Sequence, residues 1–345
     1  MPLPTRLIKL FTAASLALLA CGVSAGEYPQ WRLSQDHQPA AHNEYLLYRL
    51  AYSGIFTAFL WKDLADVALV TGPDNDRRLQ QVNSCEITLK LTTENYALAE
   101  SLRPTRYTWR SIIAPDLSRT YLIEERDEGA EAELNASWLD WKNDSIDLYR
   151  MRKKIPVGGN TGFFEDENSA ILAWEQDGAK PPPPALSHYP MLDNKYTYLV
   201  YDKTVVLPET ERLIDPLTLL YAARWNDYQS QPEIVLPISY EDEIRYYKAR
   251  LTGHETLHIG STDVPTLKID IQRTDRQTSK EEGFLIMWVS DDERRIPLQF
   301  DIKAKVGKLR VFAREQSLGE QSSADSCLSR KPANSTIANQ SQPAG

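Results

Sequence analysis

The segment Leu267-Lys268-Ile269-Asp270-Ile271-Gln272 alternates apolar and polar residues one by one. Because successive side chains of a β-strand point to opposite faces of a sheet, this alternation predicts a strand with one buried face. The same pattern returns at residues 296–303, after the polar turn Asp291-Asp292-Glu293-Arg294. Val306-Gly307-Lys308 then turns the chain into a further apolar stretch, Leu309 to Arg314. This part of the chain is therefore predicted to be an antiparallel meander with one face in the core.

The first half of the chain carries weaker strand signals of the same kind. Residues 87–92 and 106–110 alternate apolar or aromatic residues with polar ones. The aromatic and aliphatic run from Tyr45 to Trp61, broken at Ser53-Gly54, predicts two strands around a tight turn. The sequence therefore predicts a mostly-β fold with one or more curved antiparallel sheets, arranged as a half-barrel or a sandwich.

The sequence also predicts one or two short helices, and the clearest begins at Asp215-Pro216. An aspartate accepts hydrogen bonds from the free N–H groups of the first helical turn, and proline fits the first position because its missing N–H costs nothing there. Leu217, Leu220, Tyr221 and Arg224 follow at helical spacing. The pattern predicts a helix from Asp215 to about Arg224 with one apolar face.

Composition divides the chain into six segments. We predict a signal peptide at 1–25, an irregular segment at 26–44 and a first β half at 45–153. A Pro/Gly-rich insertion or linker at 154–194, which contains Pro181 to Pro184, separates it from a second β half at 195–315. Residues 316–345 lack aromatic residues and are rich in Ser, Gln, Asn and Ala, which predicts a disordered tail.

The N-terminus has the three parts of a secretory signal. Arg6 and Lys9 give the positive region, and Leu10 to Ala20 is apolar but too short to span a bilayer. Val23-Ser24-Ala25 favours ordinary cleavage before Gly26, whereas Leu18-Leu19-Ala20-Cys21 resembles the site at which a lipoprotein is cleaved and lipidated on Cys21. We expect a periplasmic protein; the alternative is an outer-membrane lipoprotein anchored at Cys21.

Net charge indicates which classes of partner are disfavoured, and the cysteine content indicates whether a disulfide can form. The formal net charge is −9, and cleavage after Ala25 would remove two cations and no acid, which leaves −11. This balance argues against nucleic acid or an anionic membrane as the main partner of the molecule. With Cys21 removed, Cys85 and Cys327 would remain and could form a disulfide in an oxidising compartment. The other interpretation is a buried Cys85 and an unpaired Cys327.

One motif suggests chemistry. His254-Glu255-Thr256-Leu257-His258 has the H-E-x-x-H spacing of zinc peptidases, in which a helix places both histidines on one face. Here Gly253, Gly260 and Pro265 flank the motif, and its β-branched neighbours favour a strand. In a strand the two histidines would lie about 13 Å apart, too far for one zinc ion. We therefore predict a β-hairpin at this position and no metal site, and we expect no catalytic residue and no cofactor.

The second half resembles a known bacterial exported family. Three stretches carry the resemblance, in this order: Ile214 to Tyr221, Thr252 to Arg273, and Trp288 to Pro297. They are similar to the family called domain of unknown function 3108, and Tyr45 to Trp61 resembles that family's opening strand pair. The resemblance covers about residues 45–315. It implies a periplasmic curved-sheet domain without established enzyme activity.

The resemblance supplies family-signature positions but no functional roles. These positions are Asp215, Pro216, Trp288, Asp291, Asp292 and Pro297.

Three functions remain open at this stage. The first is a non-catalytic cell-envelope protein that binds a lipid, an envelope polymer or a partner protein on its curved sheet. A helix of about 15 Å is too short to cover eight or more strands, which predicts an apolar groove on the concave face. The alternative arrangement has the two β halves packed on each other. The second function is a structural or assembly factor without a small ligand, and the third is a zinc hydrolase that uses His254, Glu255 and His258.

Overall fold

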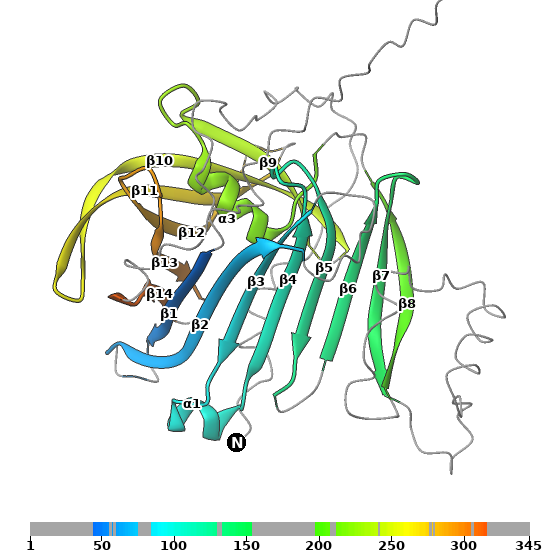
Figure 1. Cartoon of the computed structure of the whole chain (residues 1–345), viewed down its shortest axis with the longest axis horizontal. Helices are drawn as coiled ribbons and strands as arrows, with labels where there is room; N and C mark the ends of the chain where they lie inside the picture. The colour runs from blue at the N-terminus through cyan, green and yellow to red at the C-terminus, as the bar shows by residue number, and fades with distance from the viewer. Residues whose placement is uncertain are drawn as a thin grey trace, which may run out of the picture.

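The computed structural model describes residues 44–153 and 197–315, apart from gaps at 55–56, 58–59, 75–83, 130–132, 208–211, 241, 276–277, 279 and 305–306. These residues form one antiparallel sheet and two helices (Figure 1). The predicted fold class is confirmed, in the form of a single curved open sheet. The expected signal peptide, insertion and C-terminal tail lie outside the described residues.

Fourteen strands make up the sheet of the described part. The first seven are β1 (Glu44–Ser53), β2 (Lys62–Pro73), β3 (Cys85–Thr92), β4 (Arg106–Ile113), β5 (Thr120–Asp127), β6 (Glu133–Asp140) and β7 (Ser145–Lys153). The others are β8 (Thr197–Val206), β9 (Glu233–Tyr240), β10 (Glu243–Ile259), β11 (Thr262–Thr274), β12 (Glu281–Ser290), β13 (Pro297–Lys303) and β14 (Lys308–Ala313). Helix α1 spans Ala97–Leu102, and helix α3 spans Pro216–Trp225.

The strand order shows how the two halves of the chain join. The sheet runs β8-β7-β6-β5-β4-β3-β2-β1-β14-β13-β12-β11-β10-β9, so each half is a meander and the halves meet at β1 and β14. Tyr48 pairs with Ala313 there, and Ser53 pairs with Lys308. The edges of the sheet are β8 and β9, and β9 carries Pro237, whose lack of a backbone N–H is easily accommodated on an edge strand.

The strand pair predicted at Tyr45 to Trp61 is only half right. Residues 44–53 form β1, but the second strand begins at Lys62 and continues to Pro73. Gly54 and the residues up to Trp61 therefore connect two strands instead of beginning one. The helix that starts after Asp215 and the hairpin around His254 are both confirmed.

The sheet bends until its two halves touch across the interior. The ring of Trp109 in β4 stacks on that of Tyr240 in β9, with the centroids 6.1 Å apart. Near this contact, residues 213–214 join the two halves: Thr120 donates to the Leu213 carbonyl (3.0 Å), and Ser239 donates to the Ile214 carbonyl (2.7 Å). A short crossing segment thus closes the concave side at one end.

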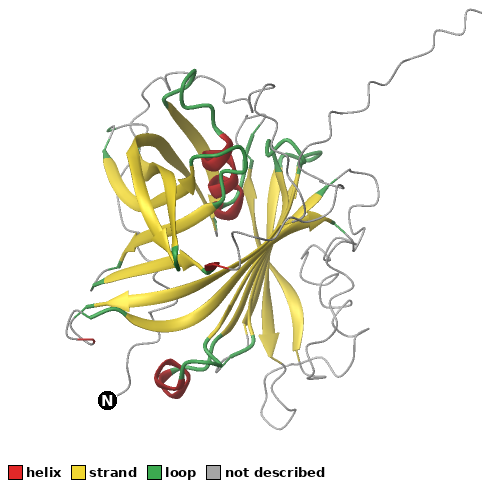
Figure 2. Cartoon of the chain, turned by 60° about the vertical axis from the view of Figure 1, so that its left-hand side comes forward, coloured by secondary structure: helices red, strands yellow, loops and turns green. Residues whose placement is uncertain are grey.

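Helix α3 lies inside this curve (Figure 2). All but two of its residues are buried, and one continuous apolar core takes side chains from α3, from β1 to β7 and from β9 to β14. The predicted open groove is therefore wrong for the described residues. Since Trp109 and Tyr240 already meet across the concave side, the helix has to fill only the space that remains. The helix is also buried nearly all round, not on one face.

A smaller apolar cluster lies on the opposite, outer face of β4 to β7. Ile112, Leu122 and Tyr149 are fully or nearly buried there, and the partly buried Trp138 and Tyr201 pack against them. This part of the sheet therefore has apolar side chains on both faces. Among the described residues, no helix has the length and apolar composition needed to span a bilayer.

Candidate functional site

The interior helix is fixed at its N-terminus by Asp215. Its side chain accepts hydrogen bonds from the backbone N–H groups of Leu217 (2.8 Å) and Thr218 (3.3 Å) and from the Thr218 hydroxyl. The hydroxyls of Ser111 in β4 and Thr120 in β5 donate to the same carboxylate, each at 2.8 Å. Asp215 thus caps the helix and also ties it to two strands, so its fully buried charge is surrounded by donors.

The C-terminus of the helix is fixed by Arg224. Its guanidinium forms two hydrogen bonds of 2.6 Å with the carboxylate of Glu44 in β1, and a third of 2.6 Å with the carbonyl of Arg294. Its charge also lies 4.5 Å from the ring centroid of Trp225. Burial alone would lower the pKa of Arg224, but the charge of Glu44 outweighs burial and raises it. The arginine therefore stays ionised inside the core.

Tyrosine hydroxyls complete the polar interior. Tyr48 donates to the Pro297 carbonyl (3.0 Å), and Tyr221 shares a hydrogen bond with Thr71. Burial raises the pKa of both phenols above the ordinary value, so both are neutral donors at physiological pH. Each of these hydroxyls has a partner within the protein, and the geometry is that of a structural network that positions α3.

The turn between β12 and β13 is closed by Asp292. Its carboxylate accepts from the Ser290 hydroxyl (2.7 Å) and from the backbone N–H groups of Arg294 and Arg295 (3.0 Å each). Burial opposes the charge, but these hydrogen bonds outweigh it and hold the pKa of Asp292 below its ordinary value. Arg295 then donates to the carbonyl of Asn226 just after α3 (3.0 Å), which links the turn to the helix.

The signature tryptophan faces outward. The indole N–H of Trp288 in β12 donates to Glu255 (2.8 Å), and the ammonium of Lys268 lies 5.2 Å from the ring centroid and pairs with the same glutamate (2.6 Å). The hydrogen bonds from Lys268 and Trp288 lower the pKa of Glu255. A glutamate engaged in this way is not a free general base.

The two histidines of the H-E-x-x-H motif bind different partners. Nδ1 of His254 lies 3.3 Å from Asp291, and Nδ1 of His258 lies 2.8 Å from Asp263. Both are exposed on β10, where the residues from His254 to His258 pair in register with β11. In the described residues, no group of three His, Cys, Asp or Glu side chains has metal-binding geometry.

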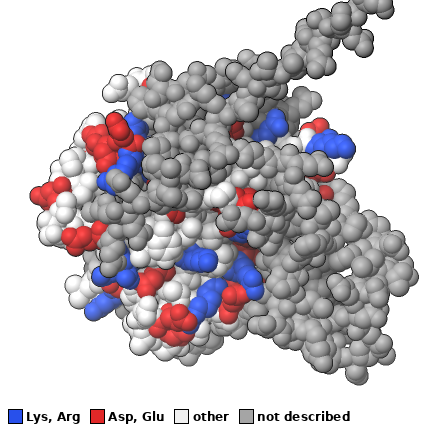
Figure 3. Space-filling model, in the orientation of Figure 1, with Lys and Arg blue, Asp and Glu red and all other residues white. Residues whose placement is uncertain are grey.

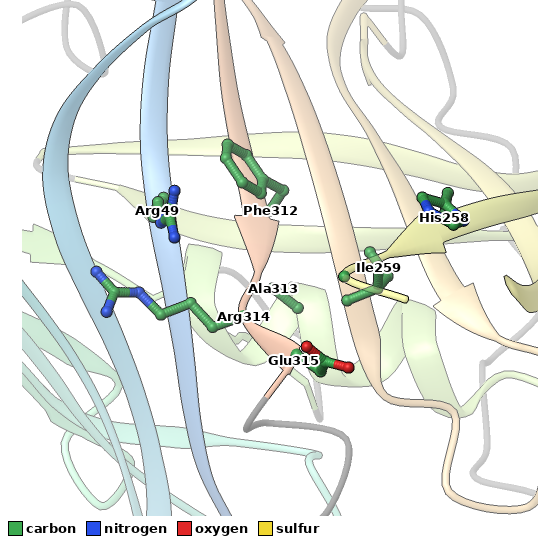
Figure 4. Close-up of a pocket in the computed structure, with 8 residues that line it drawn as sticks. Arg49, His258, Ile259, Phe312, Ala313, Arg314 and Glu315 are labelled. Atoms are coloured by element: carbon green, nitrogen blue, oxygen red, sulfur yellow. The ribbon is translucent and has the colours of Figure 1, made fainter. Parts of the chain in front are cut away.

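A cavity of about 630 Å³ lies where the β10–β11 turn approaches β1 and β14 (Figure 4). Arg49, Phe312 and Arg314 line one side, and His258 and Ile259 line the other. The two guanidinium groups and the imidazole ring at the cavity each have an acidic partner. Arg49 pairs with Asp63 (3.3 Å), Arg314 with Asp66 and His258 with Asp263. Both guanidinium groups at the cavity are therefore paired, whereas the carboxylate of Glu315, which also lines it, accepts from the Ser261 hydroxyl (3.0 Å) and has no cationic partner among the described residues.

Opposite charges also meet on the outer face of the first half. Arg110 in β4 lies 2.7 Å from Glu86 and 3.3 Å from Glu124, so it is a paired and largely covered cation. On the face that Figure 3 shows, basic and acidic side chains lie beside one another in the same way.

Cys85 is fully buried at the start of β3 and is disulfide-bonded. The only other cysteines in the sequence, Cys21 and Cys327, lie outside the described residues.

Four of the six signature positions lie at α3 or beside it, and two lie on the outer face of the sheet. Asp215 and Pro216 begin α3, Asp292 shapes the turn that contacts its other end, and Pro297 accepts from the core tyrosine. Trp288 and Asp291 lie on the outer side, with Glu255 and His254. The sequence gives no sign that Glu44 is the partner of Arg224. An arginine among apolar residues of a short helix is the one available signal of a buried pair.

Comparison with known proteins adds a family and a distant fold neighbour. No curated protein matches the chain. One solved structure, titled "Crystal Structure of Beta-barrel-like Protein of Domain of Unknown Function DUF1849 from Brucella abortus", aligns at 5% identity with a TM-score of 0.41. The alignment covers 79% of this chain and 96% of that chain. Tyr45 to Trp61 lies outside the family match, but the resemblance found in the second half is confirmed: residues 191–314 match the family described as "Protein of unknown function (DUF3108)".

Proposed function

We propose that the chain is a non-catalytic, exported protein of the cell envelope, whose β domain is a scaffold that binds an envelope partner on its outer surface. The observation that carries this proposal is the position of α3. The helix occupies the concave face and is attached at both ends, through Asp215 and Arg224. A ligand on that face would have to displace a helix that is part of the core.

Two further observations support the proposal. The carboxylate and guanidinium groups of the interior are engaged in capping and pairing, and the three H-E-x-x-H side chains are divided among four partners. The disulfide at Cys85 suits an oxidising compartment such as the periplasm. The apolar N-terminal run after Arg6 and Lys9 supports export on independent grounds.

The test combines cell fractionation with native mass spectrometry of the protein expressed with its own N-terminus. We expect a periplasmic protein that begins at Gly26 and carries no bound lipid or glycan after gel filtration. A stoichiometric lipid retained by the folded protein would contradict the scaffold and restore the carrier function. A cytoplasmic protein with an intact N-terminus would contradict export.

A further inference from the structure

The turns β1–β2 and β13–β14 lie side by side at one end of the sheet. Ser53 pairs with Lys308, and a Cβ atom built on Gly54 would lie 3.1 Å from Cα of Gly307. Five described residues at this end form what we call the Trp61 tip. They are Leu60, Trp61, Lys62, Lys303 and Lys308.

The apolar part of the Trp61 tip is exposed. Leu60 is 64% exposed and Trp61 is 42% exposed, and no other tryptophan among the described residues is classed as exposed. The sequence from Gly54 to Trp61 contains no charged residue. The guanidinium of Arg310 lies 4.7 Å from the Trp61 ring centroid, so the ring is supported on one face while much of it remains in water.

The basic part of the tip carries charge that is not neutralised. Lys303 and Lys308 are direct register partners in β13 and β14, an arrangement of like charges that destabilises a strand pair. Lys62, Lys303 and Lys308 are exposed, and within the described part of the chain none of them forms an ion pair.

The acids nearest the tip are already occupied. Asp63 pairs with Arg49, and Asp301 pairs with Arg310 through two contacts of 2.7 Å. The tip therefore presents a positive charge beside an exposed indole ring. Where Figure 3 shows described residues, basic and acidic side chains lie beside one another instead.

We propose that the Trp61 tip docks the protein on the surface of an anionic lipid bilayer. Leu60 and Trp61 enter the boundary between headgroups and acyl chains, where the amphipathic indole ring is favoured. The three lysines contact the anionic headgroups. A specific protein interface typically buries about 800 Å² on each partner, whereas an exposed Leu-Trp pair beside cations is enough to contact a bilayer surface.

The net charge, −9 for the full sequence and −11 after cleavage before Gly26, does not prevent this contact. Electrostatic interactions between exposed charges are screened beyond about 10 Å at 0.1 M salt. The ten residues of β1 alone extend about 33 Å. The acids at the far end of the sheet are therefore screened from a bilayer at the tip. The inference goes beyond the proposed function and does not depend on it, because an interior without lipid is compatible with either result below.

The test is co-sedimentation of the mature, folded protein with vesicles of phosphatidylglycerol, and with vesicles of phosphatidylcholine alone. We expect binding to phosphatidylglycerol that weakens as salt is raised, and little binding to phosphatidylcholine. Trp61→Ala should weaken binding roughly tenfold, since an exposed aromatic side chain leaves the apolar boundary. Lys303→Ser and Lys308→Ser together should weaken it by about 25-fold, at about fivefold for each cation.

Matched controls exist at the opposite end of the sheet. Strands β1 and β8 run in opposite directions, so the end of β8 lies away from the tip. Val206→Ala removes a residue that is 78% exposed there, and Lys142→Ser removes an exposed lysine from the β6–β7 turn. Both controls should bind like the parent protein. The urea midpoint of every variant establishes that it is folded.

Three results would overturn the proposal. The first is a folded parent protein that does not bind phosphatidylglycerol vesicles. The second is binding that the tip substitutions and the controls weaken equally. The third is a protein that does not bind vesicles but binds soluble polyglutamate, with weaker polyglutamate binding in the lysine variants. That last result would assign the tip to an acidic protein.

Discussion

The guanidinium of Arg224 and the carboxylate of Glu44 meet through two hydrogen bonds of 2.6 Å, although 180 positions separate the residues in the chain. The pair joins the end of the interior helix to the first strand. The arginine side chain is fully buried and the glutamate is 17% exposed. A charge that is removed from water is destabilising unless it has a partner of opposite sign, and the first prediction follows from this dependence.

Arg224→Met should lower the free energy of unfolding by about 3–5 kcal/mol, because it leaves the Glu44 carboxylate and the Arg294 carbonyl without their donor. Urea unfolding followed by tryptophan fluorescence measures the loss. Arg49→Met breaks an ion pair with 46% and 37% exposed partners and should cost less than about 1 kcal/mol. Equal losses of unfolding free energy in the two variants would show that the buried pair stabilises the protein no more than the exposed pair does.

Asp215→Ala removes the cap of α3 and leaves the Ser111 and Thr120 hydroxyls without their acceptor. We expect a loss of about 2–4 kcal/mol, from about 1 kcal/mol for the cap and more for the buried donors. Asp227→Ala is the matched control, because Asp227 makes a similar turn contact with Gln229 and Ser230 at the surface. A loss no larger than that of the control would contradict the anchoring role of Asp215.

Gly307→Ala should destabilise the β13–β14 turn by about 1–3 kcal/mol. Gly307 has φ +83°, and an added Cβ would lie 2.4 Å from the Ser53 carbonyl oxygen. Gly253→Ala meets no atom within 4 Å and should be neutral or slightly stabilising, because alanine restricts the unfolded chain. Thermal melts of the two variants measure the difference. An unchanged melting temperature in Gly307→Ala would contradict the left-handed turn.

We expect Cys85 to pair with Cys327 in the mature protein, since cleavage after Ala25 removes the remaining cysteine. Peptide mapping without reductant should recover the crosslinked peptides. Cys85→Ala should lower stability by about 2–5 kcal/mol. Reductant should destabilise the parent protein but not this variant. A Cys85–Cys21 peptide would instead show that the N-terminal segment is retained.

Asp292 gives a pH-dependent prediction. Its folded pKa lies below the ordinary value of 3.8, so its hydrogen bonds stabilise the protein above that pH. The stabilisation is lost as the pH falls from about 4 through the folded pKa. Asp292→Asn should therefore be less stable than the parent near neutrality, and the difference should shrink below pH ~3.8. Urea midpoints across this range test it, with Glu293→Gln as the surface control. A difference that does not change with pH would contradict it.

Features that depend on adjacent residues were predictable from the sequence. The helix after Asp215-Pro216 and the strand at His254 follow from capping and from local spacing, and both are confirmed. The coverage of the concave face was not predictable, because it depends on how far the sheet bends. That bend is visible only in contacts such as Trp109 with Tyr240.

The site residues divide in the same way. The signature positions Asp215 and Asp292 were found from sequence, since capping and turn formation are local properties. Glu44 was not found, because its partner is fixed only when β1 reaches the end of α3. The exposure of Trp61 is not predictable either, because its aromatic and aliphatic context favours a strand, whereas the residue precedes the first position of β2.

The pairing of β1 with β14 has a consequence for the order of folding. Tyr48 finds its partner only when Ala313 is available, so the centre of the sheet cannot close while the chain is incomplete. The other neighbouring strands of the sheet are consecutive in the chain, so the β1–β14 pair closes the longest loop and we expect it to form last. The edge of β1 stays open during synthesis, and a chain that crosses a membrane from its N-terminus completes its central strand pair last.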